Sequence, residues 1–304
     1  MWSMADLTDE DISEMQRFLL DTCADLKCWL PEPQWRPGWQ SEAARELANQ
    51  EHGQDSPWGP DPVLSVYTGA ALYLELVMQS MRALAASLTP ESTHYIPNCL
   101  VRAGMEAGSQ ALWLLEQGIG ARARVARFML VRASGARNRA EQLAKTDPGW
   151  ADKYGDVQKR EAAFAASLGL RCEYVPKGKY RGDWWCEGQK LSGYTERNRA
   201  LEAQMLSPAA YAIYSGAIHA EWNAVMDTWE PITLEDGRLA MTLRSDRVAI
   251  WAAVLVAASP AVIPAVRALQ LLDHRGRLVL VDHWVTNTLT LMRRMHLPAD
   301  WWRS

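Results

Sequence analysis

Apolar residues recur at helical spacing along most of this chain. In residues 66–88 they stand mostly three or four positions apart, and Thr89 and Pro90 follow. An α-helix has about 3.6 residues per turn, so this spacing gathers apolar side chains on one side of a helix, and the proline ends it. The same reasoning predicts a capped helix after Thr8 and further helices over residues 41–51, 100–115, 121–145, 247–272 and 278–295.

Helical periodicity fails in two segments. Residues 169–194 are rich in Tyr, Trp and Gly, a composition typical of a hairpin or an irregular insertion. In residues 229–243, Asp236 and Gly237 separate alternating apolar positions, which is a strong hairpin turn signal. The predicted fold class is therefore all-α: a helical bundle with one or two short β-hairpin or irregular insertions.

A segment rich in proline and tryptophan separates the first helix from the rest. Residues 31–62 contain six prolines and three tryptophans. We interpret this segment as an ordered wrap whose tryptophans dock on the bundle. No fixed repeat, low-complexity tract or clean linker follows. The expected organisation is an N-terminal helix and Pro/Trp-rich wrap over residues 1–62 and a single helical-bundle domain over residues 63–304.

Charge and hydropathy narrow the range of partners. The 304 residues include 32 Lys and Arg against 36 Asp and Glu, a formal charge of −4, which does not favour nucleic acid or anionic membranes through the overall field. Six arginines between residues 122 and 139 do not share one helix face, so we interpret them as a solvated surface. The longest apolar run, residues 248–266, contains Pro260 and Pro264 and predicts a buried core helix instead of a membrane span.

The five cysteines are an odd, scattered set, and no charged-then-apolar segment opens the chain. We interpret them as reduced and predict a cytoplasmic protein. Cys172 and Cys186 could meet across a hairpin as half of a zinc site, but no second pair stands at zinc spacing. Di-iron bundles use two Glu-x-x-His pairs, and the sequence offers one at that spacing, Glu91 and His94. No metal or other cofactor is therefore expected.

A polar stripe interrupts an otherwise apolar helical stretch at residues 211–222. Tyr211, Ser215 and His219 stand four positions apart, so their side chains stack along one helix face between apolar and aromatic flanks. An imidazole exchanges protons near neutral pH, which makes His219 the candidate general acid/base. Ser215 would act as a nucleophile only with His219 as its base, and it lies mid-helix without a nucleophile elbow.

A second stretch repeats the arrangement with Arg102, Glu106 and Gln110, again four positions apart. The rest of this helix is small and suited to close packing: Ala103, Gly104, Ala107, Gly108 and Ala111. A charged pair on such a helix is partly desolvated and needs further hydrogen-bond partners, which the stripe at 211–219 would supply. We expect the two helices to face each other, either as a site or as a buried polar network that fixes helix register.

The motifs RAGMEAGSQALWLL (102–115) and YAIYSGAIHAEW (211–222) resemble those of a group of helical proteins of high-GC bacteria, which is itself similar to the HEPN superfamily. The resemblance covers roughly residues 63–230. It implies a compact, often homodimeric, helical bundle. Some HEPN members cleave RNA without metal, using an Arg and a His on one helix with about four to six residues between them. No Arg precedes His219 at that spacing, so Arg102 would supply the phosphate-binding charge from the other helix.

Three functions follow from these observations. The first is a HEPN-like, metal-independent endoribonuclease or toxin/defence module, with His219 as general acid/base, Arg102 as anion binder and Glu106 as orienter, supported by Tyr211 and Ser215. The second is a non-catalytic interaction or small-molecule-binding bundle. The third is a metal- or cofactor-dependent small-molecule enzyme. The expected partners are RNA or a small-molecule ligand and a second copy of the chain, with no membrane.

Overall fold

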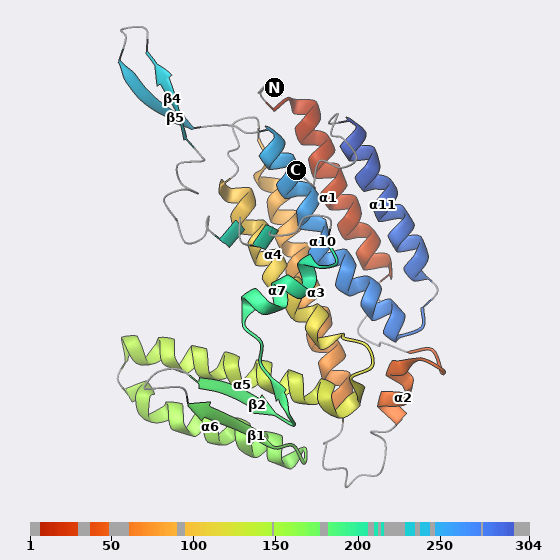
Figure 1. The fold of residues 1–304 in the computed structure, drawn as a ribbon, viewed down its shortest axis with the longest axis vertical. Helices are drawn as coiled ribbons and strands as arrows, with labels where there is room; N and C mark the ends of the chain where they lie inside the picture. Colours follow the sequence, from red (N-terminus) through yellow and green to blue (C-terminus); the bar gives the residue numbers. More distant parts are fainter. Residues whose placement is uncertain are drawn as a thin grey trace.

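The computed structural model of the protein describes residues 7–29, 37–48, 61–89, 95–147, 149–176, 182–205, 210–211, 214–215, 229–234, 238–243, 247–274 and 276–294. Most of these residues are helical (Figure 1). The predicted fold class, an all-α bundle with short β insertions, is confirmed.

The helices in chain order are α1 (Asp9–Trp29), α2 (Glu42–Ala48), α3 (Pro62–Ser87), α4 (Tyr95–Leu114), α5 (Gly120–Thr146), α6 (Gly149–Ser167), α7 (Tyr194–Glu202), α10 (Arg247–Leu271) and α11 (Gly276–Arg294). The helices predicted after Thr8 and over residues 41–51, 66–88, 100–115, 121–145, 247–272 and 278–295 are present, whereas most of the helical stretch predicted at residues 211–222 lies outside the described residues. The pattern does not predict α6 and α7. In α7, with the sequence YTERNRALE, polar residues stand on every side, so a hydrophobic stripe is lacking.

Both predicted insertions are β-structure. Strands β1 (Cys172–Pro176), β2 (Gly182–Cys186) and β3 (Gln189–Lys190) form an antiparallel sheet in that order, with Cys172 opposite Cys186. Strands β4 (Trp229–Thr233) and β5 (Leu239–Leu243) form a hairpin in which Trp229 pairs with Leu243. Its predicted turn residues, Asp236 and Gly237, lie outside the described residues.

The predicted cap of the first helix is present. Asp11 Oδ2 accepts hydrogen bonds from the backbone nitrogen and the hydroxyl of Thr8, at 3.0 and 2.9 Å, and the Asp11 backbone nitrogen donates to Thr8 Oγ1 at 3.1 Å. These reciprocal bonds satisfy donors that a helix start otherwise leaves without partners. The cap fixes where α1 begins as it enters the core.

Two groups of buried apolar side chains form the core. One gathers α1, α11, most of α10, and the parts of α3 and α4 that carry Met81 and Met105. The other gathers α5, α6, the three-stranded sheet and the opposite ends of α3, α4 and α10. Since α3, α4 and α10 enter both groups, these three helices join the upper bundle to the lower α5–α6 layer (Figure 1).

Helix α10 is the buried core helix that the sequence predicts. By length and composition, Ala249–Leu271 could also cross a membrane, but 78% of its most apolar window is buried inside the protein. It contacts α1, α3, α4 and α11. Its apolar surface is therefore covered by other helices.

The small residues of α4 permit the close packing expected of them. A Cβ added at Gly108 would lie 2.3 Å from the carbonyl oxygen of Pro260 on α10. Pro264, four residues later in the same helix, has no amide hydrogen to donate to that oxygen. The backbone of α4 thus fits against a carbonyl that lacks its usual helical partner.

Two of the six arginines between residues 122 and 139 are not solvated, which corrects the prediction. Arg124 is fully buried, with 0% of its surface exposed, and Arg127 is 8% exposed. Arg124 Nε and Nη2 donate to the carboxylate of Glu46 at 2.7 and 3.0 Å, and Tyr67 donates its hydroxyl to the same carboxylate at 2.8 Å. The buried charge of Arg124 is compensated by the opposite charge and the hydrogen bonds of Glu46. The spacing of the arginines alone does not reveal this partner.

The prediction that all five cysteines are reduced is wrong for one pair. Cys172 and Cys186 are joined by a disulfide across β1 and β2. Their sulfur atoms cannot serve as half of a zinc site in that state. The predicted cytoplasmic location rests in part on reduced cysteines. The disulfide removes that support, because disulfides are rare in the cytoplasm. The cytoplasmic location stays a prediction.

The prediction that the tryptophans of residues 31–62 dock on the bundle is wrong for Trp39, which is 85% exposed. Trp35 and Trp58 lie outside the described residues. The described part of this segment is tied to the core by α2, and by Gly38, whose backbone nitrogen donates to the carbonyl oxygen of Leu272 at 2.8 Å.

Candidate functional site

The two polar stretches singled out in the sequence do meet. Arg102 Nε donates to Glu106 Oε1 at 2.9 Å, and Arg102 Nη1 donates to the backbone oxygen of Ser215 at 3.0 Å. The Tyr211 hydroxyl donates to Glu106 Oε1 at 3.2 Å. The Arg102 guanidinium also lies 5.4 Å from the centre of the Tyr211 ring. The expectation that these two stretches face each other is confirmed.

The polar side chains of this cluster are bonded to one another. Arg102 and Tyr211 are 9% and 8% exposed, and the Glu106 side chain is 28% exposed. Burial, and next the negative charge of Glu106, raise the pKa of the Tyr211 hydroxyl, so Tyr211 acts as a neutral donor. Because Glu106 neutralises Arg102, the cluster presents little uncompensated positive charge.

Not every predicted site residue joins the cluster. Ser215 contributes its backbone carbonyl, and within the described residues its hydroxyl makes no hydrogen bond. Gln110 makes no hydrogen bond to the cluster, and its Nε2 is buried without a partner among the described residues. His219 lies outside the described residues, so its role as general acid/base stays a prediction.

Arg197 on α7 is a candidate functional residue that the sequence does not single out. It is 5% exposed, and its Nη1 donates to the backbone oxygen of Ser192. Its guanidinium lies 4.7 Å from the Tyr194 ring centre and 5.8 Å from that of Trp113. Its Nε is buried without a hydrogen-bond partner. Only the three-dimensional packing of α7 on α4 reveals this burial, because α7 is polar on every side.

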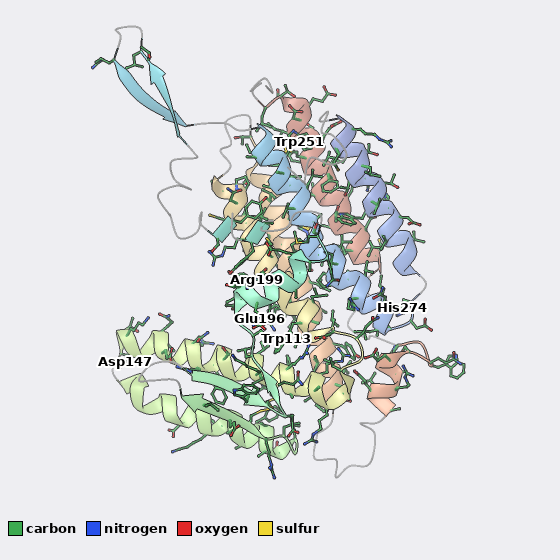
Figure 2. The ribbon with its side chains drawn as sticks, viewed as in Figure 1. Trp113, Asp147, Glu196, Arg199, Trp251 and His274 are labelled. Atoms are coloured by element: carbon green, nitrogen blue, oxygen red, sulfur yellow. A yellow bond between two sulfur atoms is a disulfide. The ribbon has the colours of Figure 1, made fainter. Side chains whose placement is uncertain are left out.

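No described carboxylate lies within ion-pair distance of Arg197. The nearest charged influences, from Glu106 and Glu196, act at longer range. Burial is the largest effect and lowers the pKa of Arg197. Tyr194, Tyr73 and these two glutamates act in the opposite direction. Figure 2 shows Glu196 and Arg199 on α7 and Trp113 below them on α4. Arg197 is therefore a buried cation without a direct counter-ion in the described part of the chain.

Two cavities share Arg197 as part of their walls. The larger, of about 400 Å³, lies between α4, α7 and α10; its walls include Leu112, Trp113, Glu116, Arg197, Ala200 and Arg267. The smaller, of about 260 Å³, lies between α3, α4, α5 and the loop before α7; its walls include Tyr73, Gln110, Ser134, Ser192, Tyr194 and Arg197. Ligand sites are typically concave and combine an apolar wall with a few placed polar groups.

Metal-ligating side chains do not cluster in the part of the chain that the structure describes. No group of three or more His, Cys, Asp and Glu residues there could hold a metal ion. The chemistry available around Arg197 is hydrogen bonding, stacking on aromatic rings and binding of anions.

Comparison with known proteins gives this chain no relatives from which to infer its site. No protein-family model, curated protein or solved structure matches it.

Proposed function

We propose that this protein is a small-molecule-binding helical bundle whose ligand occupies the cavity between α4, α7 and α10. The observation that carries the proposal is the composition of that cavity. Leu112 and Trp113 provide an apolar wall, while Glu116, Arg197 and Arg267 place polar groups around it. A volume of about 400 Å³ falls within the usual range for ligand sites.

The aromatic wall is held in place before any ligand binds. Arg127 and Arg197 lie 5.0 and 5.8 Å from the Trp113 ring centre. Arg127 Nη1 also donates to the backbone oxygen of Trp113 at 2.7 Å and to Glu116 Oε2 at 2.5 Å. A side chain fixed in this way loses little conformational freedom on binding, which favours affinity.

Filling the cavity should abolish binding. Ala200 is exposed on α7 and lines the cavity, so Ala200→Trp would place an indole in it without changing the buried core. Purified protein is incubated with a metabolite extract of its expression host, and the retained compounds are identified by mass spectrometry. We expect the wild-type protein to enrich a compound. The Ala200→Trp variant should retain at least about tenfold less of that compound.

Ala203→Trp is the matched control, because Ala203 is exposed just after α7 and does not line the cavity. It should retain the compound like wild type. Equal retention by Ala200→Trp and Ala203→Trp, or no retained compound in wild-type protein, would refute the proposal.

The ribonuclease hypothesis receives less support from the geometry. It requires Arg102 to hold a phosphate, yet the guanidinium of Arg102 is already engaged by Glu106 and by the backbone of Ser215. Among its nitrogens only Nη2 makes no hydrogen bond to the described residues, and the negative charge of Glu106 beside it opposes the binding of an anion. The same contacts suit a network that fixes α4 against Tyr211 and Ser215.

The double replacement Arg102→Met with Glu106→Leu separates these two roles. Each single change leaves a partly buried group without its partner and should cost about 1–3 kcal/mol, whereas the double change should cost less than the sum by about 1 kcal/mol. Urea unfolding measures these costs, and RNA cleavage is assayed beside it with His219→Ala. RNA cleavage by wild type that both the folded double variant and His219→Ala lose would instead establish the nuclease.

A further inference from the structure

We propose that the smaller cavity, of about 260 Å³, binds the carboxylate of a small organic acid through Arg197 and Gln110. This site is distinct from the cavity of the proposed function, although Arg197 lines both. Its volume is just below the usual range of ligand sites, about 300–1,000 Å³, which favours a small acid.

The free edge of Arg197 matches a carboxylate. Nη1 is occupied by the backbone oxygen of Ser192, whereas Nε and Nη2 make no hydrogen bond to the described residues. Nε and Nη2 lie side by side on the guanidinium and can donate in parallel to the two oxygens of one carboxylate. Leaving a buried charged donor without an acceptor is costly, so a partner from solution would be favoured.

Gln110 contributes a second donor to the same cavity. Its side chain is 5% exposed and lines the cavity, and its Nε2 is buried without a partner. Two residues on different helices, α4 and α7, therefore line one small cavity, and each carries a buried donor without a partner. Buried polar groups in proteins nearly always have partners, so two such donors at one cavity indicate a missing acceptor.

The start of α7 adds positive potential. Ser192, Gly193 and Tyr194 line the cavity, and Gly193 caps the helix without any side-chain hydrogen bond. The first amide groups of a helix have no acceptor within the helix, and the helix dipole favours a negative charge near them. The backbone thus favours the same ligand as the two side chains.

Charge balance points to a single negative charge. Arg197 is the only cation and no carboxylate is present among the described residues that line the cavity. Tyr73, Ser134 and Tyr194, which carry neutral hydroxyls, also line the cavity. One cation with neutral donors suits a monoanionic carboxylate better than a phosphate dianion, which usually engages several cations.

Acetate is the probe for this site. Thermal unfolding is followed in sodium acetate, sodium chloride and sodium phosphate at equal ionic strength, and calorimetric titration gives the Kd for acetate. We expect a saturable rise in Tm with acetate and none with chloride. Arg197→Gln should weaken acetate binding by about 100-fold and Gln110→Leu by about tenfold.

Arg199→Gln is the matched control, because it makes the same change on the exposed side of the same helix (Figure 2). It should bind acetate like wild type, as should Ala200→Trp, which blocks only the larger cavity. Arg197→Lys keeps the positive charge but loses the paired guanidinium donors, so it should also bind acetate weakly. This second variant keeps the test decisive if Arg197→Gln fails to fold. The proposal is overturned by an equal response to chloride, a stronger response to phosphate, or acetate binding that survives in Arg197→Gln.

Discussion

Arg124→Met is expected to destabilise the protein by about 3–5 kcal/mol, because it leaves a buried carboxylate without its cation. Arg124 is fully buried, and Glu46, which receives two of its hydrogen bonds, is 4% exposed. Arg124 also donates to Glu42 Oε1 at 3.2 Å and to the backbone oxygen of Leu114 at 2.7 Å. Urea unfolding at neutral pH measures the loss.

Two further variants establish that the loss comes from the unpaired charge. Arg124→Met combined with Glu46→Leu removes both charges and should recover at least about half of the loss, since apolar replacements of a buried pair are often tolerated. Arg139→Met changes an exposed arginine on the same helix and should alter stability by no more than about 0.5 kcal/mol. A double variant as unstable as the single one would contradict this account.

Gly108→Ala is expected to destabilise the protein by about 3 kcal/mol, although alanine is normally the better helix former. The added methyl would lie 2.3 Å from the carbonyl oxygen and 2.7 Å from the Cβ of Pro260. Both atoms belong to a helix at the centre of the core, so neither can move without shifting α10. The separation of α4 and α10 would have to increase, with a loss of packing along both helices.

Gly104→Ala on the same helix is expected to stabilise the protein, whereas Gly108→Ala destabilises it. Its added methyl would lie 3.7 Å from Val77 Cγ1 and 3.9 Å from Ser80 Cβ, which is ordinary contact. The greater helix propensity of alanine should then stabilise the protein by up to about 1 kcal/mol. Thermal and urea unfolding of the two variants in parallel test this prediction, and equal effects at the two positions would show it to be wrong.

The fold follows largely from local sequence patterns. Apolar spacing identified the long helices other than α6, and failed periodicity placed both β insertions. Thr8 and the acidic residues after it marked the start of α1. These features are encoded within a few neighbouring residues, so they can be found without knowledge of distant contacts. Helix α7 lacks such a local signal, and it carries Arg197.

The candidate site was predictable only in part, for the same reason. The spacing of Arg102 and Glu106 indicated an ion pair, and the polar stripe at Tyr211 indicated its partner. The burial of Arg197 and the free donor of Gln110 depend on how α3, α5 and α7 pack around α4. Such contacts join residues far apart in the chain, and no periodicity within one helix specifies them.

The ion pairs of buried Arg124 also bear on when α2 forms during folding. A helix of seven residues cannot form stably by itself, because the cost of its first turn exceeds what so few hydrogen bonds return. Helix α2 is held through Glu42 and Glu46, and their partner Arg124 is in position only when α5 has docked on α3 and α4. We therefore expect α2 to dock on an already assembled core, and changes within α2 to act on the rate of unfolding more than on the rate of folding.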